Sequence, residues 1–353
     1  MSATLDSTRV LPAAPAPTQR WGSRTPVRLG LLAVMLLVLA LATIASLFIG
    51  SGDITVADAW NALLHGGQDT TSIIVAEFRL PRTVLALLVG AALGIAGALM
   101  QAVTRNPLAD PGILGVNAGA YFAVVIAVGF FGASGISQYI WWSFIGAAVT
   151  TVVVYVIGTR GRAGGTPVLL VLAGVALAAV LGGISQGITL LNPDAFDKVR
   201  FWASGSLQGR QFDIVTGVLP FIVVGLVLAL TLPTALNAVV LGDDVARALG
   251  ANVVRTQVLS VLAVTVLCGA ATAAAGPIAF LGLLVPYLAR GIVGPDQKWV
   301  LPFSLLLGPI IFVLADILGR VIVPSELPVG IVTAFVGAPI LILLMRRKKV
   351  SAL

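Results

Sequence analysis

Charged side chains are scarce in this sequence, so the few at the edges of apolar runs are candidates for chemistry. Only 10% of the 353 residues are Asp, Glu, Lys or Arg. Arg79, Arg82 and Arg320 each lie near such an edge. The planar guanidinium of arginine binds a carboxylate through two hydrogen bonds. Alternatively, an arginine at the end of a membrane span can bury its apolar stem and keep its charge at the membrane–water interface. The residue types therefore predict either carboxylate recognition or interfacial anchoring at these positions.

Asp316 lies near the end of an apolar run, four residues before Arg320. On a helix this spacing favours an i,i+4 ion pair, which is the interpretation we prefer. A carboxylate that couples transport to protons is the alternative.

Sequence motifs for enzymatic chemistry are absent. There is no GxxxxGK[ST] phosphate loop, EF-hand, zinc signature or nucleophile elbow. Cys268 is the only cysteine and His65 the only histidine, which excludes an internal disulfide and cysteine or histidine metal clusters. We expect a protein that is not itself an enzyme and has no catalytic, metal or cofactor site.

Composition indicates a membrane protein. The chain is 58% hydrophobic, with a mean hydropathy of +1.06. Its net charge of +7 is dispersed among short loops and the two ends, which argues against nucleic acid. The basic tail from Arg346 to Lys349 directly follows an apolar run and is typical of a cytoplasmic anchor.

The uncharged runs predict the number of membrane spans. A span needs roughly 20 residues, so two of the runs are long enough for two helices each. Gly132 to Gly135 and Gly276-Pro277 mark the turns that divide them. The runs are 29–50, 83–104, 112–159, 163–193, 214–242, 256–289, 299–315 and 327–345. We therefore expect an all-α polytopic protein with about ten transmembrane helices.

The segment from Arg79 to Ala120 predicts close helix packing followed by a break. Gly90, Gly94 and Gly97 would let a neighbouring helix approach closely. The helix should then end at Arg105-Asn106-Pro107. Unsatisfied backbone groups are not tolerated in lipid, so this break must face protein, an interface or an aqueous path. The pattern favours a transporter.

The distribution of basic residues predicts the orientation. With both ends in the cytoplasm, the only ones of the 21 Lys and Arg residues that fall outside are Arg79, Arg82, Lys198, Arg200, Arg210 and Arg320. We expect a disordered cytoplasmic tail over residues 1–28, a transmembrane domain over 29–346 and a basic cytoplasmic tail over 347–353.

An offset of 179 residues suggests an internal repeat. It superposes Gly90-Ala91-Ala92 on Gly269-Ala270-Ala271, Gly97 on Gly276, and Pro107 on Pro286. An odd number of spans separates the halves, which predicts two inverted repeats.

A set of motifs is spread over most of the chain, from about Leu29 to Met345. The motifs are Arg79-Leu80-Pro81-Arg82, Gln101 with Asn106-Pro107-Leu108-Ala109, Leu114-Gly115, Gly276 to Pro286, Asp316, Arg320, Glu326 to Gly330, Thr333 and Gly337-Ala338-Pro339. Together they resemble the permease family of ABC importers for iron-siderophores, haem and vitamin B12. Tyr287 stands where that family commonly has histidine, so no role is transferred to this position.

The resemblance implies a type II ABC importer permease in the bacterial cytoplasmic membrane, with both termini in the cytoplasm. It implies a second permease subunit, identical or different, two cytoplasmic ATPase subunits, and an extracytoplasmic binding protein. Membrane lipid is the remaining partner, and nucleic acid is not one.

The resemblance also implies three sites. Arg79, Arg82 and Arg320 would dock acidic residues of the binding protein. A glycine-bracketed interior loop would couple to the ATPase through Gly242, Asp243, Ala246, Arg247, Leu249 and Gly250. Asn106 and Leu108, with Thr166 as a second element, would form the cytoplasmic gate. Alternatively, the segment from Gly242 to Gly250 is only a solvated surface turn. The alternative for the gate residues is that Asn106 before Pro107 favours a turn and Thr166 before Pro167 favours extended backbone.

The expected substrate is a ferric siderophore or a related metal chelate. Vitamin B12 and haem are the alternatives within the family, and the particular chelate stays open. An ion-coupled secondary transporter would also show inverted repeats and broken helices. It would not need an ATPase-docking loop, and intramembrane carboxylates are few here, so we prefer the ABC permease.

Overall fold

The computed structural model describes residues 25–50, 55–65, 69–133, 135–159 and 167–347, and every regular element within these ranges is helical. Thr166 and most of the two predicted tails lie outside them. The elements are α1 (Thr25–Phe48), α2 (Val56–His65), α3 (Thr70–Ile73), η2 (Ile74–Arg79), α4 (Leu80–Thr104), η3 (Pro111–Leu114), α5 (Val116–Phe131), α6 (Ile136–Thr159), α7 (Pro167–Leu191), α8 (Pro193–Ala203), α9 (Phe212–Leu230), α10 (Pro233–Val240), α11 (Asp243–Ala248), α12 (Val253–Ala275), α13 (Leu281–Val293), α14 (Gln297–Ile322) and α15 (Val329–Arg347).

Local signals in the sequence explain where many helices begin. Proline is the first residue of α7, α8 and α10, a position where its missing N–H costs no hydrogen bond. Asn192 and Asn252 cap α8 and α12 by accepting hydrogen bonds from the backbone N–H of Ala195 (3.1 Å) and Arg255 (3.0 Å). The side chain of Asp296 caps α14 through Lys298 N–H (3.0 Å).

The number of apolar helices agrees with the sequence prediction. Within the described ranges, seven helices are long and apolar enough to span a bilayer, and α5, α13 and α15 are shorter apolar helices. The two predicted turns are present, because α5 ends before Gly132 and α12 ends at Ala275. The helical segment that contains the uncharged run 83–104 begins earlier than the run, since it extends from Thr70 to Thr104.

The helix α4 lies at the centre of the molecule, where 83% of its apolar window is buried, against 17% for α1 and for α7. It packs against α14, α12 and α13. A Cβ atom added to Gly90 would lie 2.6 Å from Pro309 Cα, and one added to Gly94 would lie 2.7 Å from Ser304 O. The predicted close helix approach at these glycines is therefore confirmed.

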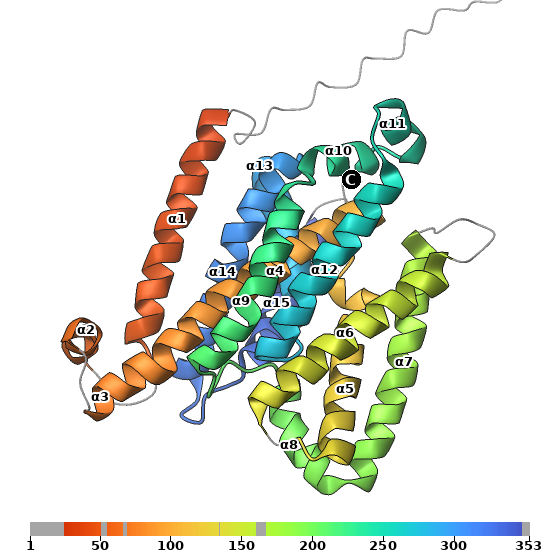
Figure 1. Ribbon diagram of the computed structural model, residues 1–353. Helices are drawn as coiled ribbons and strands as arrows, with labels where there is room; N and C mark the ends of the chain where they lie inside the picture. The colour runs from red at the N-terminus through yellow and green to blue at the C-terminus, as the bar shows by residue number, and fades with distance from the viewer. Residues whose placement is uncertain (1–24, 51–54, 66–68, 134, 160–166, 348–353) are drawn as a thin grey trace, which may run out of the picture.

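The helices present two opposite ends, which we call the α11 end and the α8 end (Figure 1). The α11 end carries α10 and α11, and α1 begins and α15 ends there. The α8 end carries α2, α3 and α8. The predicted break after α4 lies toward the α11 end, while the first turn of α4 and the last turn of α14 lie toward the α8 end.

Two series of helices support the predicted inverted repeats. The series α4, α5, α6, α7 and the series α12, α13, α14, α15 each place a shorter apolar helix second. The first helix of one series runs toward the α11 end, and the first helix of the other runs away from it (Figure 1). The offset of 179 residues does not hold locally, because Pro107 lies in a turn and Pro286 lies inside α13.

Candidate functional site

A buried cluster of charged side chains lies at the α8 end, where four segments meet. Arg79 is the last residue of η2, and Arg82 lies in the first turn of α4. Asp316 and Arg320 are one turn apart on α14, and Glu326 lies in the turn between α14 and α15. We call these five residues the charge cluster.

Arg82 is the centre of the charge cluster. Its Nε and Nη2 donate to Asp316 Oδ1 at 3.0 and 2.8 Å, and its Nη1 donates to Glu326 Oε2 at 2.6 Å. The side chain of Asp316 is 0% exposed and also accepts from Arg320 Nη2. Two carboxylates thus compensate the buried guanidinium, as a buried charge requires.

The other two arginines of the cluster hold the end of α1. Arg320 Nη1 donates to the carbonyl oxygen of Ser46 at 2.8 Å, and Arg79 Nη1 donates to those of Leu47 and Phe48 at 3.1 Å. The last carbonyl groups of a helix have no partner within it, and positive charge is favourable there. The arginines therefore fasten α1 to α4 and α14.

The structure changes the interpretation of the three predicted docking residues. Arg79, Arg82 and Arg320 are only 5%, 9% and 4% exposed, so simple anchoring at a lipid interface is wrong for them. The predicted i,i+4 pair between Asp316 and Arg320 is confirmed. The residue that the sequence analysis missed is Glu326, whose only signal was its place in the motif from Glu326 to Gly330. Docking of another protein stays a prediction.

The predicted coupling segment forms the short helix α11 at the α11 end. Gly242 and Gly250 bracket it with φ angles of +112° and +79°, conformations that side chains disfavour. Leu249 is 65% exposed, whereas Ala246 is 0% exposed and packs with Val239 and Val253. Ala246 therefore anchors α11 through its buried side chain, and any part that it has in ATPase coupling, which stays a prediction, is to shape α11 from within.

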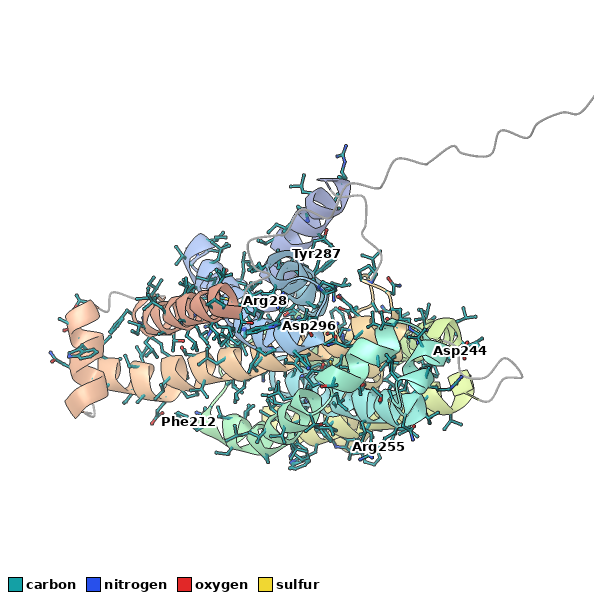
Figure 2. All side chains as sticks on the ribbon, turned by 90° about the horizontal axis from the view of Figure 1, so that it is seen from above. Arg28, Phe212, Asp244, Arg255, Tyr287 and Asp296 are labelled. Atoms are coloured by element: carbon teal, nitrogen blue, oxygen red, sulfur yellow. The ribbon has the colours of Figure 1, made fainter. Side chains whose placement is uncertain are left out.

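A groove of about 510 Å³ lies beside α11. Both α10 and the segment around Leu249 contribute to it. An adjoining hollow of about 330 Å³ follows the segment from Arg247 to Val254. Among the labelled side chains, Asp244 and Arg255 lie on the same side of the molecule, away from Phe212 (Figure 2). The lining is mixed polar and apolar, which suits contact with a protein surface. The residues that line the groove of about 510 Å³ are Thr231, Thr234, Ala235, Asn237, Ala238, Leu241, Leu249, Gly250 and Ala251.

Arg105 joins the coupling segment to the break after α4. It caps α4 with a φ of +51°, an unusual conformation for a residue other than glycine. Its Nε donates to Val239 O at 2.8 Å in α10, and its Nη2 pairs with Asp243 in α11. The segments predicted as ATPase dock and gate are therefore in direct contact.

The predicted gate residues lie just after Arg105. Asn106 is exposed, and its Oδ1 accepts from Leu108 N–H at 2.9 Å, which shapes the turn. Leu108 is 40% exposed. The third predicted gate residue, Thr166, lies outside the described residues.

A second connection runs from α10 to α14. Asn237 in α10 donates to Asp296 Oδ1 at 2.7 Å and accepts from Gln297 N–H at 2.8 Å. Arg28 lies over the ring of Trp299 at 5.3 Å, and Arg28, Tyr287 and Asp296 lie together near the middle of this end (Figure 2). The helix α10 is thus held both by Arg105 at the end of α4 and by the start of α14.

Arg210, in the segment between α8 and α9, is buried without a carboxylate partner. It is 3% exposed, and its Nε donates to Ser206 O at 3.3 Å while its Nη1 has no partner among the described residues. Burial alone lowers the pKa of Arg210 to about 10, so it stays protonated at neutral pH. The sequence analysis gave this residue no role beyond its predicted outer location.

The described residues contain no group of three or more His, Cys, Asp or Glu side chains that could hold a metal ion. A crevice of about 220 Å³ between α13, α14 and α15 is lined almost entirely by apolar side chains, among them Phe280, Leu284, Leu314 and Val336. The charged groups of the site form ion pairs between arginines and carboxylates, and the crevice offers an apolar surface.

Fold and site together define a polytopic, all-helical membrane transport protein. The model of the FecCD transport family matches residues 37–347, so the chain belongs to this family. The relatives are themselves permeases rather than enzymes.

The similar proteins agree with this placement. The chain is 51% identical to the ferric enterobactin transport system permease protein FepD of Escherichia coli (strain K12), with 89% of this chain and 94% of that protein covered. It is 41% identical to the Fe(3+)-citrate import system permease protein YfmD of Bacillus subtilis (strain 168), with 92% and 96% covered.

Solved structures share the fold. A structure described as an inward-facing metal-chelate type ABC transporter superposes with a TM-score of 0.80 at 25% identity, covering 90% of this chain and 99% of that one. PsaBC from Streptococcus pneumoniae superposes with a TM-score of 0.56 at 16% identity, covering 75% and 90%, which is a likeness of fold alone.

Proposed function

We propose that this chain is the membrane permease of an ATP-driven importer that moves a ferric siderophore from a binding protein into the cytoplasm. The observation that carries the proposal is the 51% identity over 314 residues to a ferric enterobactin permease. Relatives named for citrate and hydroxamate chelates of Fe(3+) widen the substrate class to ferric chelates.

The α11 end is the proposed ATPase side. Its groove, the exposed Leu249 and the glycine-bracketed helix α11 offer a dock for a soluble subunit. Arg105 ties α11 to the turn that holds Asn106 and Leu108, so movement of a docked ATPase would be transmitted to this turn. Two ATPase subunits and a second permease copy, identical or homologous, complete the proposed importer.

The α8 end is the proposed outer side, where the binding protein docks. The excess of Lys and Arg predicted for the opposite side supports this orientation, in which both termini lie in the cytoplasm. The membrane in question is the bacterial cytoplasmic membrane. Arg82 and its neighbours supply the positive charge that an acidic binding surface would seek.

An ion-coupled transporter is a weaker alternative. A coupling carboxylate needs access to a proton path, whereas the side chain of Asp316 is 0% exposed and accepts hydrogen bonds from both Arg82 and Arg320. Vitamin B12 or haem as substrate is the alternative within the ABC class.

Reconstitution tests this proposal. The permease, its ATPase and its binding protein are placed in proteoliposomes, and uptake of radioactive ferric enterobactin is followed. We expect uptake that requires ATP and the binding protein and that survives collapse of the proton gradient. Uptake driven by the gradient without ATP would overturn the ABC mechanism. Uptake of cyanocobalamin or haem, but of no ferric chelate, would overturn the substrate class.

A further inference from the structure

The two carboxylates that hold Arg82 are anchored very differently. Asp316 lies within α14, is fully buried, and bonds to two arginines. Glu326 lies in the short turn between α14 and α15, and its side chain is 11% exposed. The bond from Arg82 to Asp316 is therefore built into the helix packing, whereas the bond to Glu326 depends on the position of a turn at the surface.

The backbone at Glu326 is in an unfavourable conformation. Its φ is +54°, one of three positive values at described residues other than glycine. A left-handed conformation is unfavourable for a residue with a Cβ atom. The turn is held by Glu326 N–H on Val323 O and Leu327 N–H on Gly319 O, both at 2.9 Å. In this conformation the carboxylate of Glu326 contacts Nη1 of Arg82.

The charge cluster carries more positive than negative charge. Arg79, Arg82 and Arg320 face the two carboxylates of Asp316 and Glu326. If Glu326 moved away, Nη1 of Arg82 would be left without its carboxylate, while Nε and Nη2 would keep their bonds to Asp316. Another carboxylate could then take the same place, and Arg82 would stay desolvated and paired throughout.

This geometry resolves a conflict between motif and burial. A docking arginine must reach its partner, yet Arg82 is only 9% exposed. We propose that Glu326 is an internal stand-in for an acidic side chain of the extracytoplasmic binding protein, which displaces it from Arg82 on docking. The inference rests on the proposed function. It adds that the binding protein must displace Glu326 in order to reach Arg82.

Competition makes a directional prediction. Replacing Glu326 with Gln removes the competing charge and leaves the side chain nearly the same size. Hydrogen bonds to charged groups are stronger than neutral ones, so the intruding carboxylate should gain roughly five- to tenfold in affinity. Glu77 is an exposed carboxylate on η2 at the same end of the molecule, and Glu77→Gln is the matched control for a general change in charge.

The experiment measures the affinity of the binding protein, loaded with ferric enterobactin, for the permease–ATPase complex in nanodiscs. We expect tighter binding for Glu326→Gln and an unchanged Kd for Glu77→Gln. Glu326→Asp, which keeps the charge but shortens the reach, should lie between wild type and Glu326→Gln, and it serves if the first variant does not fold. Unchanged or weaker binding in the folded Glu326 variants, or equal tightening in Glu77→Gln, overturns the proposal.

Two further measurements distinguish a failure of this proposal from a failure of the docking hypothesis for Arg82. If Arg82→Gln abolishes binding while Glu326→Gln has no effect, Arg82 docks the partner and the stand-in role of Glu326 is wrong. If folded Arg82→Gln binds with the wild-type Kd, Arg82 does not dock the binding protein, and the proposal for Glu326 is wrong as well. Ferric enterobactin alone should bind wild type and Glu326→Gln equally, and a gain for the free chelate would overturn a protein carboxylate as the occupant.

Discussion

At the scale of single residues, buried arginines differ in what surrounds them. Arg82 is matched by Asp316 and Glu326, whereas Arg210 has no carboxylate partner and keeps Nη1 unpaired among the described residues. Removing one charge of a buried ion pair leaves the other charge uncompensated and destabilises the fold. A buried charge without an oppositely charged partner already lowers the stability of the fold, so removing it need not destabilise the protein. The two residues should therefore respond oppositely to the same substitution.

Arg210→Met should leave the protein as stable as wild type or stabilise it by about 1–4 kcal/mol, because an unpaired cation is replaced by an apolar chain of similar length. Arg82→Met should destabilise it by up to about 3–5 kcal/mol, since Asp316 and Glu326 lose their shared partner. Thermal unfolding midpoints of both variants in the same detergent test this. A lower midpoint for Arg210→Met would mean that its bond to Ser206 O matters more than its unpaired charge.

At the scale of elements, α10 and α11 form one unit that is held at two points. Arg105 ties it to α4, and Asn237 with Asp296 ties it to α14. Ala246 fills the space beneath α11, while Leu249 projects from it. A test of the coupling segment must therefore change Leu249 and leave Ala246 intact, because an aspartate at 246 would place an unpaired charge in the packing that shapes α11.

Leu249→Asp should preserve folding and membrane insertion but reduce co-purification of the ATPase at least about tenfold, as expected for losing one central apolar contact. Phe201→Asp is the matched control, because Phe201 is 66% exposed, close to the 65% of Leu249, and lies on α8 at the opposite end. Size-exclusion chromatography of the solubilised complex gives the yield. An undiminished ATPase yield with Leu249→Asp would place the dock elsewhere.

At the scale of the whole molecule, the proposed mechanism links the two ends through α4 and α14. Both helices reach from the charge cluster at the α8 end to the connections around α10 at the α11 end (Figure 1). Their packing at Gly90 and Gly94 is too close to allow a side chain between them. We expect the pair to move as one body, so that the turn at Asn106 and Leu108 responds to both ends.

A cysteine at Leu108 should report this response. In a Cys268→Ala background, Leu108→Cys should form a disulfide with its counterpart in a second permease copy when the gate is closed, and ATP should change the yield. Cys268 is 2% exposed, and the Cys268→Ala parent alone should give no crosslink. Crosslinking is read from non-reducing gels of proteoliposomes. No crosslink with or without nucleotide would remove this turn from the transport pathway.

Much of the fold could be predicted from the sequence because its signals are local. Uncharged runs of sufficient length indicate spans, and Gly132 and Gly276-Pro277 end helices through their own backbone preferences. The helix that contains the run 83–104 extends beyond the run for a physical reason. Arg79 and Arg82 interrupt the apolar sequence, but the helix continues through them because tertiary partners compensate their buried groups.

The sequence by itself determined that this chain is a polytopic helical membrane protein of the transporter class. Hydropathy and motif spacing are properties of neighbouring residues in the chain, so they can be assessed without the tertiary structure. Only the tertiary structure decided what the charged residues do. Arg82 and Asp316 are 234 residues apart, and Arg105 and Val239 are 134 apart. Such pairs form because the packing of α4 against α14 and α10 brings them together, and that packing depends on many weak contacts that no single segment specifies.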